Sequence, residues 1–208
     1  LNAVTLRLDG VGLLLSGAVL ALAIVVTLFS YRYVGGEEGE EKYYALLVAM
    51  SGVMIGLGCA ADLFNLWVWF EAMAVTSYLL VAFYRNQPGA LEAGVKYVIQ
   101  SACGSILVAL GIALVFTHSG TLDLAQIPAK ITMPAPLILT AGVFFVVGFG
   151  VKSALVPLHT WLPDAHSQAP SGISAMLSGV VIEAGLVALL RSLGVLSGLG
   201  APIAALLL

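Results

Sequence analysis

Residues 150–191 read GVKSALVPLHTWLPDAHSQAPSGISAMLSGVVIEAGLVALLR and join two apolar runs through a polar, proline-rich elbow. Lys152 lies within the first run, Pro157 breaks that run, and Glu183 lies in the middle of the second. A charge placed in hydrocarbon costs several kcal/mol unless another group compensates it. If these runs cross a membrane, the stretch therefore marks either a polar interior or a structural break.

The composition is that of an integral membrane protein. Of the 208 residues, 61% are hydrophobic and only 9% are charged, and the mean hydropathy is +1.07. The apolar residues fall in long runs without the polar stripe that an amphipathic helix of a soluble protein shows. The formal net charge is −3 and there is no basic cluster, so a nucleic-acid partner is not expected.

Runs of roughly 20 apolar residues predict transmembrane helices. Polar segments separate six such runs, and residues 201–208 read as the start of a seventh. The six predicted spans are 11–34, 43–61, 66–84, 91–117, 136–157 and 172–193. We therefore predict an all-α fold, a polytopic transmembrane helix bundle with one helix broken at Pro157, in a single transmembrane domain over residues 1–208. Because the sequence starts at Leu1 and stops within an apolar run, we interpret it as an internal piece of a longer protein.

Four ionisable residues lie inside the predicted spans, and these are Glu71, Lys96, Lys152 and Glu183. At roughly 2.5–3.5 kcal/mol for each charge at the bilayer centre, four unpaired charges would cost on the order of 10–14 kcal/mol. We therefore expect them to face one another or a water-filled interior. Together they would form a polar path inside the bundle.

Other interpretations of these charges stay open at this point. The long side chains of Lys96 and Lys152 can extend toward the membrane interface, where Trp161 reads as an interfacial residue. Glu71 can be an interfacial carboxylate. Glu183 has uncharged neighbours on both sides, so for this residue a structural ion pair is the main alternative.

A Glu–Lys pair inside a membrane can handle protons. Burial favours the neutral form of each group, whereas a neighbouring opposite charge favours the charged form. A pair that separates by a few ångströms can therefore change its protonation, which is the minimal device for a gated proton step. A break such as the one at Pro157 admits water and is tolerated where the backbone lines a cavity.

The sequence predicts no metal or cofactor site in this chain. Cys59 and Cys103 lie inside apolar runs without a CxxC partner, which is typical of buried free thiols. His159, His166 and Asp164 fall in the elbow and are interpreted as loop residues rather than as a metal triad.

The elbow carries a motif that resembles a known family, the antiporter-like membrane subunits of respiratory complex I. The same superfamily includes subunits of membrane-bound [NiFe] hydrogenases and of Mrp-type cation/proton antiporters. The motif is K-S-A-x-x-P-x-H-x-W-L-P-D-A-H over residues 152–166, followed by Ala169-Pro170 and Ser174-Ala175. Shorter matches are Leu8-Asp9-Gly10, Phe70-Glu71, Lys96-Tyr97 and Gly120-Thr121-x-Asp123.

The resemblance implies a fold and roles for single residues. Family members have roughly fourteen helices in two inverted five-helix repeats, and this chain would hold the first repeat and the helix before it. Glu71 and Lys152 resemble the central ion pair, with Lys96 beside them. His159 would be a hydrated relay residue at the broken helix. Where many members have Lys or His in the next helix, this chain has Glu183, a carboxylate that can relay protons or bind Na⁺.

The function implied is that of a proton-translocating subunit of a redox-driven membrane complex, of the NADH:quinone oxidoreductase or membrane-bound hydrogenase type. Protons would move through Glu71, Lys96, Lys152, His159 and Glu183, and the chain would have no redox centre of its own. Expected partners are other membrane subunits, including further antiporter-like ones, within the lipid bilayer of a prokaryotic cell membrane. Two alternatives are an Mrp-type Na⁺/H⁺ antiporter subunit and a structural membrane scaffold whose charges only hold helices together.

Overall fold

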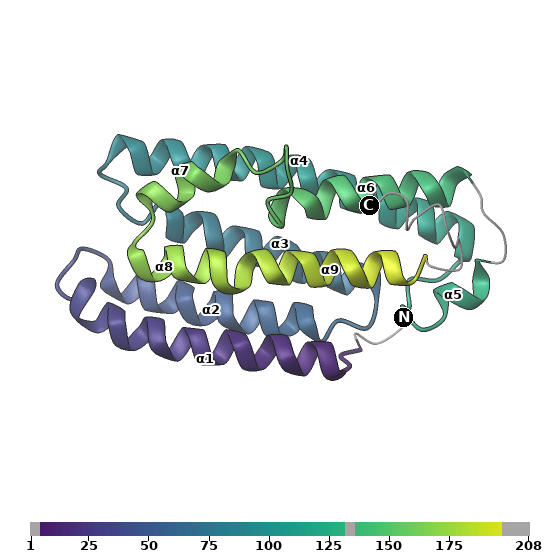
Figure 1. The fold of residues 1–208 in the computed structure, drawn as a ribbon, viewed down its shortest axis with the longest axis horizontal. Coiled ribbons are helices and arrows are strands. Elements are labelled where there is room, and N and C mark those ends of the chain that lie inside the picture. Colours follow the sequence, from purple (N-terminus) through teal and green to yellow (C-terminus); the bar gives the residue numbers. More distant parts are fainter. Residues whose placement is uncertain (1–4, 132–135, 197–208) are drawn as a thin grey trace.

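The structure is a computed structural model, which describes residues 5–131 and 136–196. Its regular elements in these residues are all helical and run along one common direction (Figure 1). They are α1 (Gly10–Tyr33), α2 (Glu40–Gly58), α3 (Leu63–Val81), α4 (Pro88–Ser119), α5 (Ile127–Lys130), α6 (Pro136–Lys152), α7 (Trp161–Gln168), α8 (Ser171–Met176), the π-helical η1 (Leu177–Val181) and α9 (Ile182–Gly194). The predicted all-α bundle is confirmed.

Four helices in the described residues are long and apolar enough to cross a membrane: α1, α3, α4 and the continuous helix Ser171–Gly194. The helix α6 is apolar but shorter. The remaining predicted span, α2, has Glu40, Glu41 and Lys42 in its first turn and runs beside α1 and α3 (Figure 1). The predicted start of a seventh span, from residue 201, lies outside the described residues.

The outer surface is apolar in the way expected of a membrane protein. Large side chains on it include Leu14, Leu28 and Val48, which are 76%, 72% and 71% exposed. Soluble monomers rarely present broad patches of this kind to water. Lipid or neighbouring membrane proteins are the surroundings that suit these side chains.

The interior is packed closely where glycines face each other. The helices α4 and α6 lie along one another. A Cβ added to Gly148 would lie 2.5 Å from the carbonyl oxygen of Gly104, and one added to Gly104 would lie 2.8 Å from that of Gly148. Small residues at such crossings allow the close backbone approach that stabilises helix pairs in membranes.

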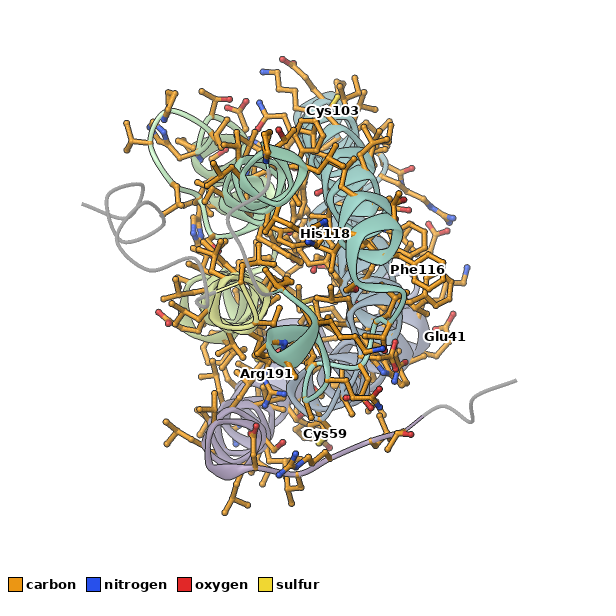
Figure 2. All side chains as sticks on the ribbon, turned by 90° about the vertical axis from the view of Figure 1, so that its right-hand side faces the viewer. Glu41, Cys59, Cys103, Phe116, His118 and Arg191 are labelled. Atoms are coloured by element: carbon orange, nitrogen blue, oxygen red, sulfur yellow. The ribbon has the colours of Figure 1, made fainter. Side chains whose placement is uncertain are left out.

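One end of the bundle is tied by backbone hydrogen bonds between three linking segments. Residue pairs Leu6–Ala60 and Asp62–Asp123 form isolated antiparallel bridges there. Arg191 near the end of α9 donates to Asp9 Oδ1 at 2.6 Å and to the carbonyl oxygen of Ala60 at 3.2 Å. Figure 2 looks onto this end and shows Arg191 between α9 and α1.

The two cysteines are free thiols and lie far apart in Figure 2. Cys59 is half-buried at the tied end, so the expectation of a buried free thiol is met only in part. Cys103 is exposed on α4, so the expectation that both are buried was wrong for this residue. Its helix face points outward because Gly104, one residue later, is the position that packs against α6.

The first half of the broken helix, α6, ends earlier than expected. The prediction placed the end of this span at Pro157, but α6 ends at Lys152 and α7 starts at Trp161. Leu155 N donates to Gly150 O at 2.9 Å and Ala154 N to Val151 O at 3.2 Å, the two bonds of a Schellman C-cap. Ala154 takes the left-handed position of that motif, with φ 51°. The cap therefore ends α6 before the proline can.

Candidate functional site at the break between α6 and α7

The break lies midway along the bundle, where α6 stops and the chain turns before α7 continues in the same general direction (Figure 1). Residues 153–160 between them are non-helical. The C-terminal end of a helix carries partial negative charge because its peptide dipoles are aligned. Lys152 is the last residue of α6, so its ammonium group is placed where that charge favours a cation.

Lys152 is the only charged side chain among the buried residues of the described ranges, and it is 1% exposed. Its Nζ donates a hydrogen bond to the hydroxyl oxygen of Tyr97 on α4 at 2.5 Å. The same Nζ lies 4.4 Å from the centre of the Tyr97 ring. An aromatic hydroxyl and ring compensate part of the cost of burying this ammonium group.

Glu71 faces Lys152 from the middle of α3 without touching it. The Glu71 carboxylate acts on Lys152 electrostatically, but in the described part of the chain the two form no direct ion pair. Glu71 is half-buried, and its Oε1 is buried without a hydrogen-bond partner in these residues. The structure thus places the two residues expected to form the central pair near enough to interact electrostatically, but not in direct contact.

Lys96 lies outside this pair. Its side chain is 47% exposed and its Nζ contacts Glu92 Oε1 and Asp164 Oδ2, both at 2.8 Å. The salt bridge to Asp164 joins α4 to α7, and the bond from Gln100 Nε2 to Thr160 Oγ1 at 2.5 Å reinforces that join. Lys96 therefore holds the second half of the broken helix against α4, and the adjacent Tyr97 occupies the place beside Lys152.

Glu183 also lies outside the pair, because it is exposed on the outer side of α9. The contact of α9 with the site comes two residues later. A Cβ added to Gly185 would lie 2.9 Å from Ser153 Oγ and 3.2 Å from Lys152 Cβ. The π-helical turn η1 directly precedes α9, and such turns are frequent at functional sites.

His159 lies within the break, as expected, and is half-buried. Its Nδ1 is buried and has no hydrogen-bond partner among the described residues. A buried ring nitrogen of this kind is suited to a water molecule or a transferable proton. His159 does not form an ion pair with any described residue.

Two aromatic residues of the site were missed or misread in the sequence. Trp161 was predicted at the membrane interface but is fully buried. Its ring stacks on that of Tyr97 at 4.0 Å with 1° between the planes, and its Nε1 donates to Val151 O at 2.7 Å. The Lys96-Tyr97 pair in the motif was the only sequence signal for Tyr97. Tyr97, and not the charged Lys96, occupies the place beside Lys152.

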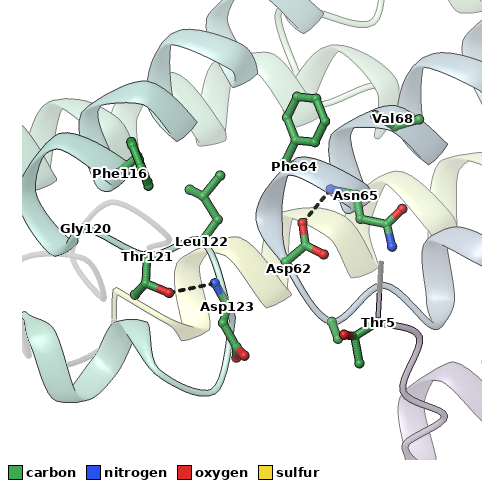
Figure 3. Close-up of a pocket in the computed structure, with 11 residues that line it drawn as sticks. Thr5, Asp62, Phe64, Asn65, Val68, Phe116, Gly120, Thr121, Leu122 and Asp123 are labelled. Atoms are coloured by element: carbon green, nitrogen blue, oxygen red, sulfur yellow. Dashed lines mark hydrogen bonds between the residues drawn. The ribbon is translucent and has the colours of Figure 1, made fainter. Parts of the chain in front are cut away.

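A cavity of about 410 Å³ opens at the tied end of the bundle. Asp62 and Asp123 line it from two neighbouring segments (Figure 3). Asp62 Oδ1 accepts a bond from Asn65 N at 2.7 Å, and Asp123 Oδ1 accepts one from Ala125 N at 2.8 Å. These carboxylates thus cap a helix and a turn. In residues 5–131 and 136–196 no cluster of three or more His, Cys, Asp or Glu side chains is arranged to hold a metal.

The family model described as "NADH:quinone oxidoreductase/Mrp antiporter, TM" matches residues 60–208, which is more than half of the chain. The chain belongs to this family. It is a multi-pass membrane protein of the antiporter-like type, and the resemblance stated from the sequence is confirmed.

Relatives of this antiporter-like chain include respiratory subunits of bacteria. The NADH-quinone oxidoreductase subunit N of Desulfitobacterium hafniense is 35% identical over 175 residues, covering 83% of this chain and 35% of the relative. The NAD(P)H-quinone oxidoreductase chain 4 1 of a Synechococcus strain is 35% identical over 200 residues, covering 93% and 36%. The chain therefore spans little more than a third of the length of these curated relatives. Their occurrence agrees with a prokaryotic cell membrane.

Solved structures similar to the antiporter-like chain are membrane subunits of respiratory complexes. A chain of the archaeal membrane-bound sulfane sulfur reductase superposes with a TM-score of 0.83 at 29% identity, covering 91% of this chain and 38% of that one. A chain of respiratory complex I from Thermus thermophilus superposes with a TM-score of 0.78 at 25% identity, covering 92% and 42%. The fold of the complex I membrane subunits is thereby established for this chain, whereas the inverted-repeat arrangement stays a prediction.

Proposed function

We propose that this chain forms part of a proton-translocating subunit of a redox-driven membrane complex. The observation that carries the proposal is the burial of Lys152 at the end of a broken helix, facing Glu71 without contact. A buried ammonium group that only holds helices together would be expected to pair directly with its carboxylate. A pair held slightly apart can instead close and open as protons arrive and leave.

The proposed proton step uses the chain's own residues. When Lys152 is charged, Tyr97 and the end of α6 stabilise it. When Lys152 loses its proton, Glu71 can accept a proton on Oε1, which has no hydrogen-bond partner among the described residues. His159, with its unpartnered Nδ1 in the break, would connect Lys152 to water through the non-helical segment.

Lys96 and Glu183 keep a place in this proposal at the outer surface. Lys96 would take up or release protons at α4, where Glu92 and Asp164 hold it. Glu183 would continue the path on the outer side of α9, where it is exposed. Intramembrane carboxylates that face away from their own bundle are expected to meet other protein rather than lipid.

The partners we propose are other membrane subunits, including further antiporter-like ones. The similar proteins named above are subunits of multi-subunit respiratory complexes, which supports membrane-subunit partners in general. We also propose that redox cofactors belong to those partners. Neither cysteine lies in a CxxC motif, which supports a chain that moves ions without its own redox centre.

The test is Glu71→Gln in the full-length protein within its assembled complex, reconstituted in proteoliposomes. We expect electron transfer to continue in uncoupled vesicles while proton translocation is lost. Glu92→Gln is the matched control, since Glu92 is 67% exposed and lies outside the proposed pair. Normal translocation in assembled Glu71→Gln complexes would show that this carboxylate has no part in the proton path.

A further inference from the structure

Tyr97 contacts the site through its hydroxyl group and through its ring. The hydroxyl oxygen accepts the hydrogen bond from Lys152 Nζ, and no carboxylate of the described residues forms a direct ion pair with that nitrogen. A phenol is neutral near pH 7. The Tyr97 hydroxyl therefore binds the ammonium group without neutralising its charge. A direct ion pair with Glu71 would neutralise that charge.

The position of the Tyr97 ring is fixed from the side of α7. Tyr97 and Trp161 are both fully buried, and their rings stack in parallel with their centres 4.0 Å apart. Trp161 in turn donates to Val151 O, the residue before Lys152. These contacts connect the end of α6 at Val151 to Trp161, Trp161 to Tyr97, and Tyr97 to Lys152.

Three helices besides α6 approach Lys152. The helix α3 contributes the carboxylate of Glu71 and α4 contributes Tyr97. The helix α9 approaches with its backbone at Gly185, and Glu183 is exposed on its outer side. Ser77 of α3 lies beside the Tyr97 hydroxyl. Of the two groups Glu71 and Tyr97, the ammonium group is bonded to the neutral one.

We infer that Tyr97 is a positioning residue for Lys152: its hydroxyl holds the ammonium group off Glu71, and Trp161 ties that position to α7. This inference rests on the proposed function, because it explains how the central pair is kept open. Movement of α7 against α4 would move the stacked rings and release Lys152 toward Glu71. The salt bridge of Lys96 with Asp164 and the bond of Gln100 with Thr160 hold α7 in the position described here.

The decisive variant is Tyr97→Phe in the full-length protein within its assembled complex, because it removes the hydroxyl and keeps the ring. We expect the rate of proton translocation to fall roughly tenfold, the change that corresponds to losing one hydrogen bond to a charged group. Lys152 would then pair directly with Glu71, and a desolvated ion pair resists separation. Tyr43→Phe is the matched control, since Tyr43 is equally buried and its hydroxyl bonds to Ser30 at 2.7 Å instead.

An infrared measurement tests the contact without relying on translocation. The tyrosine C–O stretching band that disappears in Tyr97→Phe should shift in Lys152→Met, and the band assigned from Tyr43→Phe should not. An unshifted Tyr97 band, or translocation at the unaltered rate in Tyr97→Phe, would overturn the inference. If Glu71→Gln complexes pump normally, the proposed function fails, and the band shift alone then decides whether Tyr97 positions Lys152.

Discussion

Replacement of Lys152 by Met should separate function from stability. Met has a similar length but carries no charge, so the buried site no longer contains an ammonium group. Removing a charge from the membrane interior gains roughly 2.5–3.5 kcal/mol. Losing the hydrogen bond to Tyr97 costs about 1.5–3 kcal/mol, as for other bonds to charged groups. The net change thus lies between roughly 0.5 kcal/mol against Met and 2 kcal/mol in favour of Met.

The measurement compares thermal unfolding and proton translocation of the same purified complexes. We expect Lys152→Met complexes to assemble normally, to unfold at the same or a higher temperature, and to lose translocation. Lys130→Met serves as the control, because Lys130 is exposed in the short helix α5. This control should change neither quantity.

The opposite result would refute the reasoning. A scaffold in which Lys152 only holds helices together predicts that Lys152→Met impairs assembly, and that those complexes which do assemble translocate protons normally. A fall in the unfolding temperature of several degrees together with normal translocation would therefore remove the basis for the proposed function.

Four further substitutions test the fold, each by thermal unfolding in detergent unless stated otherwise. Gly148→Ala should lower stability by roughly 1–3 kcal/mol through overpacking, since the new Cβ would lie 2.5 Å from a carbonyl oxygen of α4. Gly52→Ala, with nothing within 4 Å of an added Cβ, should instead stabilise the protein by about 0.5–1 kcal/mol. Equal changes in stability for Gly148→Ala and Gly52→Ala would contradict the described packing. Ala154→Gly should stabilise the protein by roughly 0.5–1 kcal/mol, because glycine adopts the left-handed backbone conformation without strain. A loss of stability would argue against the Schellman cap. Arg191→Gln should cost about 1 kcal/mol and speed amide exchange in residues 5–9, and unchanged exchange would show that this side chain does not hold the segment.

Much of the fold could be predicted because lipid restricts it so strongly. Long apolar runs located the helices within a few residues, as for α1 and α4. The cost of charge in hydrocarbon singled out Glu71, Lys96, Lys152 and Glu183. Of these, the structure buries Lys152 with Glu71 half-buried nearby, and it exposes Lys96 and Glu183. These predictions depended on the free energies of placing apolar and charged side chains in lipid, which are larger than the effects of local backbone geometry.

The rest depended on details that a hydropathy pattern does not contain. One residue along a helix turns the side chain by about 100°, so Lys96 points to the surface and Tyr97 to Lys152. The same geometry exposes Glu183 and turns Gly185 inward. The end of α6 depended on a left-handed Ala154, a position that Gly usually signals. Trp161 was assigned to the interface because its preference for that region is strong, but stacking on Tyr97 outweighed it.

The unequal fastening of the two ends of the bundle has a mechanical consequence. Where α9 finishes, backbone bridges and Arg191 clamp three linkers, whereas at the far side the loops before α2 and α4 are joined by an exposed salt bridge between Arg85 and Glu38. The helices α7 and α8 meet at the end of the bundle opposite the backbone bridges (Figure 1). A displacement of α7 at that end would reach Lys152 through the stacked rings of Trp161 and Tyr97.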